Sequence, residues 1–260
     1  MVNYSFSLID LEYFLLILVR VSMFISLAPF YSTQGVPRQV KLGLAFFVSL
    51  LLFPATQPHP ELVYNTVMGY AVLIAKEALT GLFLGLAVSI CTSITSFSGK
   101  IIDMEIGLSM ANLMDPTTKE MSTVSGVFYQ YMVTLLLMLS GMYRYLIQAL
   151  AETFTLIPVN GAVFNPDELL SSMLSFLSSY IMIGFRICLP VFAVMILLNA
   201  VLGIMAKVAP QMNMFAVGMK LKVLVGLCIL FLTVGMIPGI ADFIYTEMKR
   251  TLVMFVESMM

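Results

Sequence analysis

Few residues of this 260-residue chain have the types and spacing that catalysis or metal binding requires. The one histidine, His59, lies between two prolines, and the three cysteines, Cys91, Cys188 and Cys228, lie far apart in apolar runs. None has a second Cys or His at metal-ligand spacing. The sequence contains neither a G-x-x-x-x-G-K-[ST] motif nor an H-E-x-x-H motif. We therefore expect no catalytic residue, no metal, no cofactor and no enzymatic activity.

Charged residues inside the apolar runs are the next candidates, because a charge in hydrocarbon is costly and usually faces protein or water. Lys76 and Glu77 are adjacent, and Arg186 precedes Pro190 by one helical turn. Neighbours on a helix point in different directions, so Lys76 and Glu77 are not expected to pair with each other. One alternative is that these side chains reach toward water or bind backbone groups that Pro190 leaves without a hydrogen bond. The other is that they form polar contacts between subunits, together with Asn199.

The segment 98–112 is amphipathic, with Lys100, Asp103 and Gly107 on one helical face. Such a segment is typical of a helix lying at the membrane interface. Joined to the Leu113-Met114-Asp115-Pro116 sequence that follows, it can instead form a re-entrant element lining a cavity. Non-helical backbone at that depth is tolerated only where protein or water covers it.

The composition shows which class of protein must position these residues. The chain is 60% hydrophobic and only 10% charged, with a mean hydropathy of +1.01 and a net charge of -1. A soluble domain carries about 25% charged residues. A soluble enzyme, a disordered scaffold and a nucleic-acid-binding protein are therefore excluded, and an integral membrane protein remains.

Six apolar runs follow one another, and they predict an all-α membrane protein. They cover residues 11–31, 42–53, 62–97, 124–143, 169–206 and 223–241. A spanning helix needs about 20 residues to cross about 30 Å. The second run is short, whereas the third and fifth would exceed about 50 Å at about 1.5 Å per residue. We expect long kinked helices and helical hairpins that are covered by protein rather than by lipid.

Glycine and proline mark where these long runs can bend. Gly81 and Gly85 lie in the third run, and Gly184 and Pro190 lie in the fifth. A helix start is predicted at Asn165-Pro166, where a capping residue precedes proline and two acids.

Methionine is unusually frequent, with 22 residues. Two clusters are evident: Met104, Met110, Met114 and Met121, and Met205, Met212, Met214 and Met219. Thioether side chains adapt to irregular neighbours, so these residues form either a soft seal around a moving polypeptide or ordinary lipid-facing filler.

One long motif identifies a family. From Arg186 the sequence follows RxxLPxxxxxxLxNxxLGxxxxxAPQMNxFxxG and ends at Gly218. With the GxxxDxxxG pattern of Gly99, Asp103 and Gly107, and the Asp115-Pro116 pair, this sequence resembles the R subunit of the bacterial flagellar type III export gate (the FliR/SctT family). The similarity covers nearly the whole chain, and it favours the flagellar member over the injectisome member.

The resemblance implies a division of the chain and a closing element. Residues 1–168 would form a part like the gate's P subunit, and residues 169–260 a helical hairpin like its Q subunit with a C-terminal tail. The loop 111–122 would plug the pore. The plug residues would be Asn112, Leu113, Met114, Asp115 and Pro116, flanked by Gly99, Asp103, Gly107, Met110 and Met121.

The resemblance also implies partners and a location. The P and Q subunits would join this chain in a hetero-oligomer in the bacterial inner membrane, within the flagellar basal body, and unfolded export substrates would pass through it. The export apparatus' A and B subunits would be further partners, and no nucleic acid would bind. The resemblance further implies a cytoplasmic turn that contacts these partners, which we call the contact turn. It would contain Lys207, Pro210, Gln211 and Asn213. Lys207, Lys220 and Lys222 place that turn on the cytoplasmic side by the positive-inside rule.

Two other functions fit a membrane protein of this composition. A small-solute secondary transporter would need a binding site near the membrane midplane, commonly between internal repeats and broken helices. The two halves of the chain share no spacing of charges or prolines that would indicate such a repeat. A passive membrane scaffold without a pore is the other alternative.

Overall fold

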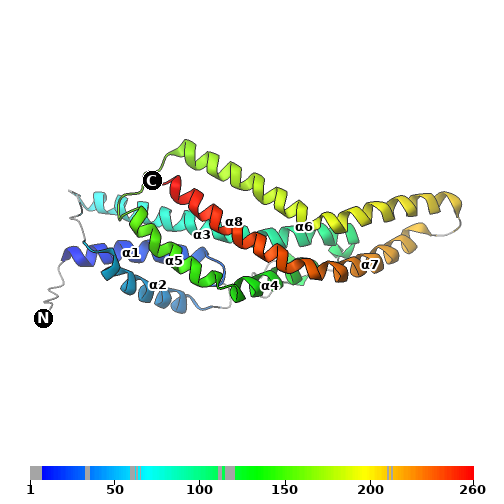
Figure 1. Ribbon diagram of the computed structural model, residues 1–260, viewed down its shortest axis with the longest axis horizontal. Helices are drawn as coiled ribbons and strands as arrows, with labels where there is room; N and C mark the ends of the chain where they lie inside the picture. The colour runs from blue at the N-terminus through cyan, green and yellow to red at the C-terminus, as the bar shows by residue number, and fades with distance from the viewer. Residues whose placement is uncertain are drawn as a thin grey trace. The chain divides into compact units, whose positions relative to one another are not determined.

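The computed structural model describes residues 8–260 except 33–35, 59–61, 63, 65, 111–112, 115–120, 210 and 212. The described residues are overwhelmingly helical (Figure 1). The helices are α1 (Leu8–Leu27), α2 (Arg38–Leu52), α3 (Val67–Ile106), α4 (Val124–Leu139), α5 (Met142–Leu156), α6 (Pro166–Val208), α7 (Met214–Thr233) and α8 (Ile237–Glu257). Short 3-10 turns occupy Phe53–Thr56, Leu108–Met110 and Val234–Met236. Two short strands, β1 (Leu113–Met114) and β2 (Met121–Ser122), pair in antiparallel orientation.

The lengths of the helices confirm an all-α membrane protein. Within the described residues, four helical stretches are long and apolar enough to cross a membrane: Arg38–Thr56, Val67–Ile106, Pro166–Val208 and Ala216–Glu257. The broken pair α4 and α5 would make a fifth. As straight helices, the 40 residues of α3 and the 43 residues of α6 would measure about 60 Å and 65 Å, roughly twice the thickness of the hydrocarbon core.

Several boundaries differ from the predicted ones. Helix α3 continues to Ile106, so the amphipathic segment after Phe97 is not a separate interfacial helix. Helix α6 is unbroken through Pro190. The apolar run 124–143 is interrupted instead at Gly141, whose φ of 76° ends one helix and begins the next. The start of α6 at Pro166 is confirmed, and Asn165 Oδ1 accepts a hydrogen bond from the backbone N of Asp167 at 3.2 Å.

The chain forms two compact units, each assembled from separate stretches of sequence. The first unit contains Met1–Ile90, Gly141–Phe176 and Glu247–Met260, and the second contains Cys91–Ser140 and Leu177–Thr246. The division at residue 168 concerns likeness to other subunits rather than packing, and it stays a prediction.

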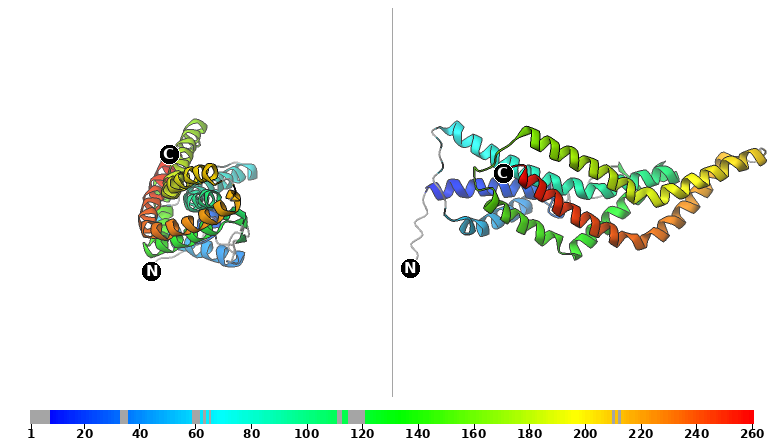
Figure 2. Two further views of the ribbon diagram at one scale, coloured as in Figure 1. Left: turned by 90° about the vertical axis from the view of Figure 1, so that its right-hand side faces the viewer. Right: turned by 45° about the horizontal axis from the view of Figure 1, so that its top comes forward.

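In the first unit, α1 is the central helix. Its buried face includes Leu16, Ile17 and Phe24. Phe14 packs edge-on against Phe46 of α2 with ring centroids 5.5 Å apart, and α1 and α2 lie side by side in Figure 1 and in the right-hand view of Figure 2. Gly81 and Gly85, which were expected to bend α3, lie where α3 contacts α1. A Cβ at Gly85 would lie 3.0 Å from the carbonyl oxygen of Phe24.

In the second unit, the C-terminal part of α3 is covered by helices α4, α6 and α7. Ser98 Oγ donates a hydrogen bond to the carbonyl oxygen of Gly184 in α6 at 3.0 Å. A Cβ built at Gly226 of α7 would lie 2.6 Å from Ile106 Cγ1, so these two helices are in close contact. The C-terminal half of α6, yellow in Figure 1, and α7, orange, run antiparallel and form a hairpin.

Candidate functional site: the loop between α3 and α4

The segment 107–123 connects α3 to α4, and we call it the α3–α4 loop. It begins at Gly107, whose φ of 91° ends α3 while its backbone N donates to the carbonyl oxygen of Asp103 at 3.0 Å. Strands β1 and β2 then pair Leu113 with Ser122 and Met114 with Met121. The described part of the loop is therefore a 3-10 turn next to α3 and a pair of antiparallel strands, the second of which leads into α4.

Asp103 joins the two ends of this loop. Its Oδ2 accepts a hydrogen bond from the backbone N of Ser125 at 2.7 Å, and its Oδ1 accepts one from Ser125 Oγ at 2.5 Å. Both side chains are buried. Ser125 is the second residue of α4, and the N-cap residue Thr123 makes no side-chain capping bond. Asp103 thus caps α4 from a neighbouring helix, at the end where the helix dipole favours a carboxylate.

Gly99 sets the distance between α3 and α4. A Cβ at this position would overlap the backbone of Gly126, so α3 and α4 touch backbone to backbone. The GxxxDxxxG pattern therefore combines three functions on successive turns of one helix: a close helix contact, a cap for the next helix and a helix end. The amphipathic pattern indicated Asp103 and Gly107, the resemblance added Gly99, and the packing of these three residues explains their spacing.

The structure describes part of the predicted plug. The backbones of Leu113 and Met114 form β1, that of Met121 begins β2, and that of Met110 ends the 3-10 turn after Gly107. Asn112, Asp115 and Pro116 lie outside the described residues. The plugging role itself stays a prediction.

The predicted contact turn lies between α6 and α7. Lys207 in the last turn of α6, Gln211 and Asn213 are all exposed, and Pro210 lies outside the described residues. Asn213 is the N-cap of α7, and its Oδ1 accepts from the backbone N of Ala216 at 3.3 Å. The turn thus presents polar groups at the end of a largely apolar hairpin.

Glu77 was expected to contact another subunit, but the structure places its partner within the chain. Glu77 Oε2 lies 2.6 Å from Arg20 Nε, and neither side chain is exposed to solvent. A fully buried carboxylate has no surface to offer a second subunit. Arg20 lies inside the first apolar run, 11–31, and a basic residue in such a run is the sequence signal that could have identified the partner.

The same ion pair fixes the end of α5. Arg20 Nη1 donates to the carbonyl oxygen of Ile157 at 2.9 Å, and the guanidinium lies 4.3 Å from the centre of the Phe154 ring. Glu77 Oε1 accepts from the backbone N of Asn160 at 2.9 Å. A cation at the C-terminal end of a helix is favoured by the helix dipole. The pair therefore organises α1, α3, α5 and the turn after α5.

The other predicted inter-subunit residues have more accessible side chains. Lys76 is half-buried, and Arg186 and Asn199 are exposed. The guanidinium of Arg186 lies 6.0 Å from the ring centre of Phe243 in α8, at the outer limit of a cation–π contact. The inter-subunit role of these three residues stays a prediction.

Tyr31, just after α1, connects to the beginning of α5. Its hydroxyl donates a hydrogen bond to the carbonyl oxygen of Tyr143 at 2.7 Å. Burial, with a smaller contribution from Tyr143, raises the pKa of Tyr31 to about 12. Tyr31 is therefore a neutral donor at physiological pH.

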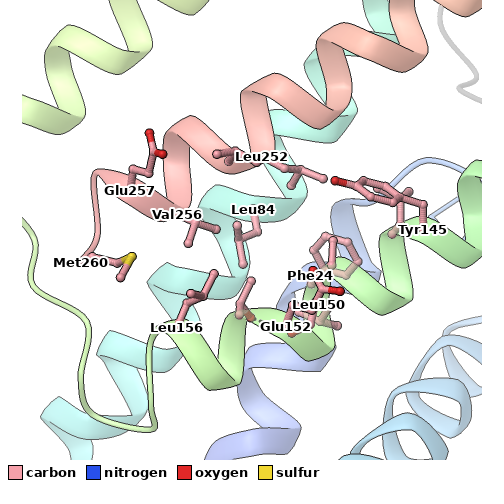
Figure 3. Close-up of a pocket in the computed structure, with 14 residues that line it drawn as sticks. Phe24, Leu84, Tyr145, Leu150, Glu152, Leu156, Leu252, Val256, Glu257 and Met260 are labelled. Atoms are coloured by element: carbon pink, nitrogen blue, oxygen red, sulfur yellow. Dashed lines mark hydrogen bonds between the residues drawn. The ribbon is translucent and has the colours of Figure 1, made fainter.

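A cavity of about 210 Å³ lies in the first unit, among α1, α3, α5 and α8. Figure 3 shows Leu84 of α3 facing Leu252 and Val256 of α8, with Leu150 and Leu156 supplied by α5. Glu152 and Glu257 contribute carboxylates to the lining. In the part of the chain that the structure describes, no group of three or more His, Cys, Asp or Glu residues can hold a metal ion.

Comparison with known proteins identifies a family whose members are similar to this chain. Residues 11–248 match the family model described as bacterial export proteins, family 1. The chain is 31% identical over 234 residues to the flagellar biosynthetic protein FliR of Bacillus subtilis (strain 168), covering 89% of this chain and 90% of the relative. The protein of the same name from Aquifex aeolicus (strain VF5) is 31% identical over 221 residues, covering 84% and 83%. That from Escherichia coli (strain K12) is 28% identical over 236 residues, covering 90% and 89%.

Proposed function

Because the chain belongs to family 1 of the bacterial export proteins, we propose that it is a component of the protein-conducting export gate of the flagellar type III secretion system. The relatives' printed name supports a role in building the flagellum. Several helices able to cross a membrane support a membrane location, which we assign to the inner membrane at the flagellar basal body. The chain is needed for flagellum assembly because filament components must pass through the gate.

The α3–α4 loop closes the gate at rest. This proposal is supported by one observation above all: strands β1 and β2 of the loop pair with each other, and Asp103 of α3 binds Ser125 of α4 where the two helices flank the loop. A loop anchored at both ends can occupy a pore without being lost from it, and it can be displaced without unfolding the helices beneath. Asn112, Leu113, Met114, Asp115 and Pro116 form the plug, and Met110 and Met121 adjoin it.

The partners of the chain are other components of the flagellar export machinery. We assign the hetero-oligomeric contacts to the gate's P and Q subunits, with residues 1–168 resembling P and residues 169–260 resembling Q. The exposed turn of Lys207, Gln211 and Asn213 then contacts the B subunit on the cytoplasmic side, and the A subunit lies below the gate. Lys76, Arg186 and Asn199 provide polar contacts between subunits.

The chain acts as a conduit rather than as an enzyme. It has no nucleotide-binding motif, so the energy for export comes from other components. A solute transporter needs convergent polar groups around its substrate. The cavity in Figure 3 is mainly aliphatic, and the carboxylate of Glu77 is already engaged by Arg20. No observation favours the transporter alternative.

Deletion tests the plug directly. Residues 111–122 are replaced by a short Gly-Ser linker, and the whole gate is purified and reconstituted in planar bilayers. We expect P and Q subunits to co-purify as with the unaltered chain, and the bilayer to conduct small ions at rest. An assembled gate that stays closed to ions after this replacement would contradict the proposal. A matched control replaces the same residues by a Gly-Ser segment of equal length, which separates loss of the plug's chemistry from loss of its length.

A further inference from the structure

Basic residues from three separate parts of the chain lie close together in the first unit, and we call them the basic cluster. Arg38 and Lys41 are in the first turn of α2, Arg144 is in the first turn of α5, and Lys249 and Arg250 are in α8. All five belong to the first unit. They are spread over most of the sequence, so only the fold brings them together.

Hydrogen bonds connect the start of α2 to the start of α5. Lys41 Nζ donates to the carbonyl oxygen of Ser32 at 2.9 Å. Tyr31, the residue before Ser32, donates to the carbonyl oxygen of Tyr143 at 2.7 Å. Arg144 Nε in turn donates to the Tyr143 hydroxyl at 2.8 Å. The positive charges of α2 and α5 therefore share one part of the surface.

Tyr145 joins α8 to the same surface. Lys249 Nζ lies 4.5 Å from the centre of the Tyr145 ring, within the range of a cation–π contact. Arg38, Arg144 and Arg250 are exposed, and none of them forms an ion pair with another described residue. Tyrosine is enriched where membrane proteins meet the lipid headgroups, and basic side chains reach toward that level. The composition of the basic cluster and its tyrosines is typical of a membrane–water interface.

The exposed face of α2 borders this charge with apolar side chains. Arg38, Leu42, Phe46 and Leu50 follow at four-residue spacing, so they lie on one face of the helix. The three apolar side chains are 62%, 51% and 51% exposed. From Arg38 to Leu50 the helix rises about 18 Å, close to the half-thickness of about 15 Å of the hydrocarbon core. An acyl chain that covers this face therefore has its headgroup beside Arg38.

The local electrostatics favour an anion at this headgroup level. Arg38 and Lys41 lie at the positive end of the α2 dipole, where cations are disfavoured, and the first turn contains no acidic residue that offsets them. A phosphate group offers several acceptor oxygens to both the guanidinium and the ammonium. Helix α2 also begins the stretch Arg38–Thr56, which is long and apolar enough to cross a membrane. A phospholipid provides the phosphate and the acyl chain in one molecule.

We propose that the basic cluster binds the phosphate headgroups of anionic phospholipids, while Leu42, Phe46 and Leu50 contact the acyl chains. The inference goes beyond the proposed export function, because it assigns the level at which the first unit meets the membrane surface and the class of lipid that it prefers. It does not depend on the role of the α3–α4 loop.

The experiment measures which lipid stays bound to the purified chain. The chain is held in neutral-detergent micelles with equal amounts of phosphatidylglycerol and phosphatidylcholine, and native mass spectrometry gives the ratio of the two bound lipids. The double variants are Arg38→Gln with Lys41→Gln, Arg144→Gln with Arg250→Gln, and the control Lys100→Gln with Lys220→Gln. The control removes two exposed positive charges from the second unit. The measurement is repeated with the complete gate, at high salt, and with added inorganic phosphate.

We expect the unaltered chain to retain phosphatidylglycerol in preference to phosphatidylcholine. Each variant of the basic cluster should lower the ratio by about ten- to thirtyfold, because each basic residue near an anionic lipid surface strengthens binding by about fivefold. The control should keep the ratio of the unaltered chain. High salt should reduce the preference, because exposed charges are screened. The complete gate should show the same pattern as the isolated chain.

Other outcomes overturn the inference. An equal loss in the control variant shows an effect of net charge alone, and a preference that is absent or insensitive to salt shows that the charges do not select the lipid. Displacement of the lipid by an equal concentration of inorganic phosphate makes free phosphate the ligand. A preference of the isolated chain that disappears in the gate means that another subunit covers the basic cluster. If one cluster variant does not fold, the other decides, and if neither folds, the salt dependence of the unaltered chain decides.

Discussion

Arg20 Nε of α1 lies 2.6 Å from Glu77 Oε2 of α3, and both side chains are completely buried. The two residues are 57 positions apart in sequence. Desolvating two charges is costly, and further hydrogen bonds offset part of that cost, although Arg20 Nη2 is buried without a hydrogen-bond partner. Here the carbonyl oxygen of Ile157 and the backbone N of Asn160 supply those bonds. The pair thus specifies how α1, α3 and the end of α5 meet in the first unit.

Removing either partner should destabilise the chain strongly. Glu77→Gln leaves the Arg20 guanidinium buried without its carboxylate partner, and Arg20→Met leaves the Glu77 carboxylate buried without its guanidinium partner. Each substitution should therefore lower the free energy of unfolding by about 3–5 kcal/mol. The measurement is denaturant-induced unfolding of the purified chain in mixed micelles. Asp242→Asn, at an exposed position in α8, is the control and should change the free energy by less than about 0.5 kcal/mol.

The double variant Arg20→Met with Glu77→Gln separates this pair from two independent effects. It should cost clearly less than the sum of the single variants, with a coupling of at least about 1 kcal/mol. Strictly additive costs would mean that the two side chains do not act as a pair.

Adding one methyl group at Gly99 should disrupt the contact between α3 and α4. The Cβ would meet the backbone of Gly126, which cannot move aside as a flexible side chain can. We expect Gly99→Ala to lower the free energy of unfolding by about 1–3 kcal/mol. Gly43→Ala in α2 is the matched control, because no atom lies within 4 Å of its Cβ position.

The control Gly43→Ala should be neutral or should stabilise the chain by up to about 1 kcal/mol, because alanine has a higher helix propensity than glycine. Equal effects of the two substitutions in the isolated chain would show that the close contact at Gly99 is unimportant.

The fold class could be predicted from the composition and from the length of the apolar runs, because a chain with 10% charged residues cannot cover a water-facing surface. The start of α6 was also predictable, because Asn165 and Pro166 act through local backbone chemistry. The break at Gly141 was missed because the apolar run continues across it. A glycine with positive φ can end a helix inside an apolar run.

The partners in the site were less accessible to prediction. Periodicity shows which face of a helix is polar, but it does not show which other helix that face meets. Asp103 and Glu77 were both noted from the sequence, yet Ser125 and Arg20 were not named as their partners. Each pairing depends on a close helix crossing at a glycine. Gly99 packs on Gly126, and Gly81 packs on the backbone of Arg20. Such crossings are tertiary contacts, which one sequence does not specify.

We predict that the turn between α6 and α7 has two separable roles, a structural one at Asn213 and a proposed binding one at Lys207 and Gln211. Asn213→Ala should cost about 1 kcal/mol of stability, because the N-cap bond to Ala216 is lost, whereas Asn213→Asp should retain it. Lys207→Glu should leave the isolated chain's stability within about 0.5 kcal/mol, because the side chain is exposed.

The binding role is measured with purified gate and the B subunit of the export apparatus. Lys207→Glu with Gln211→Ala should weaken this interaction by about two- to fivefold, and added salt should reduce the difference, because exposed charges contribute little and are screened. Lys100→Glu, an exposed charge reversal on α3 in the same unit, is the control and should bind normally. If both charge reversals weaken binding equally, the effect comes from net charge and the turn is not the contact. If Asn213→Asp is stable yet fails to bind, Asn213 contacts the partner through its amide as well as capping α7.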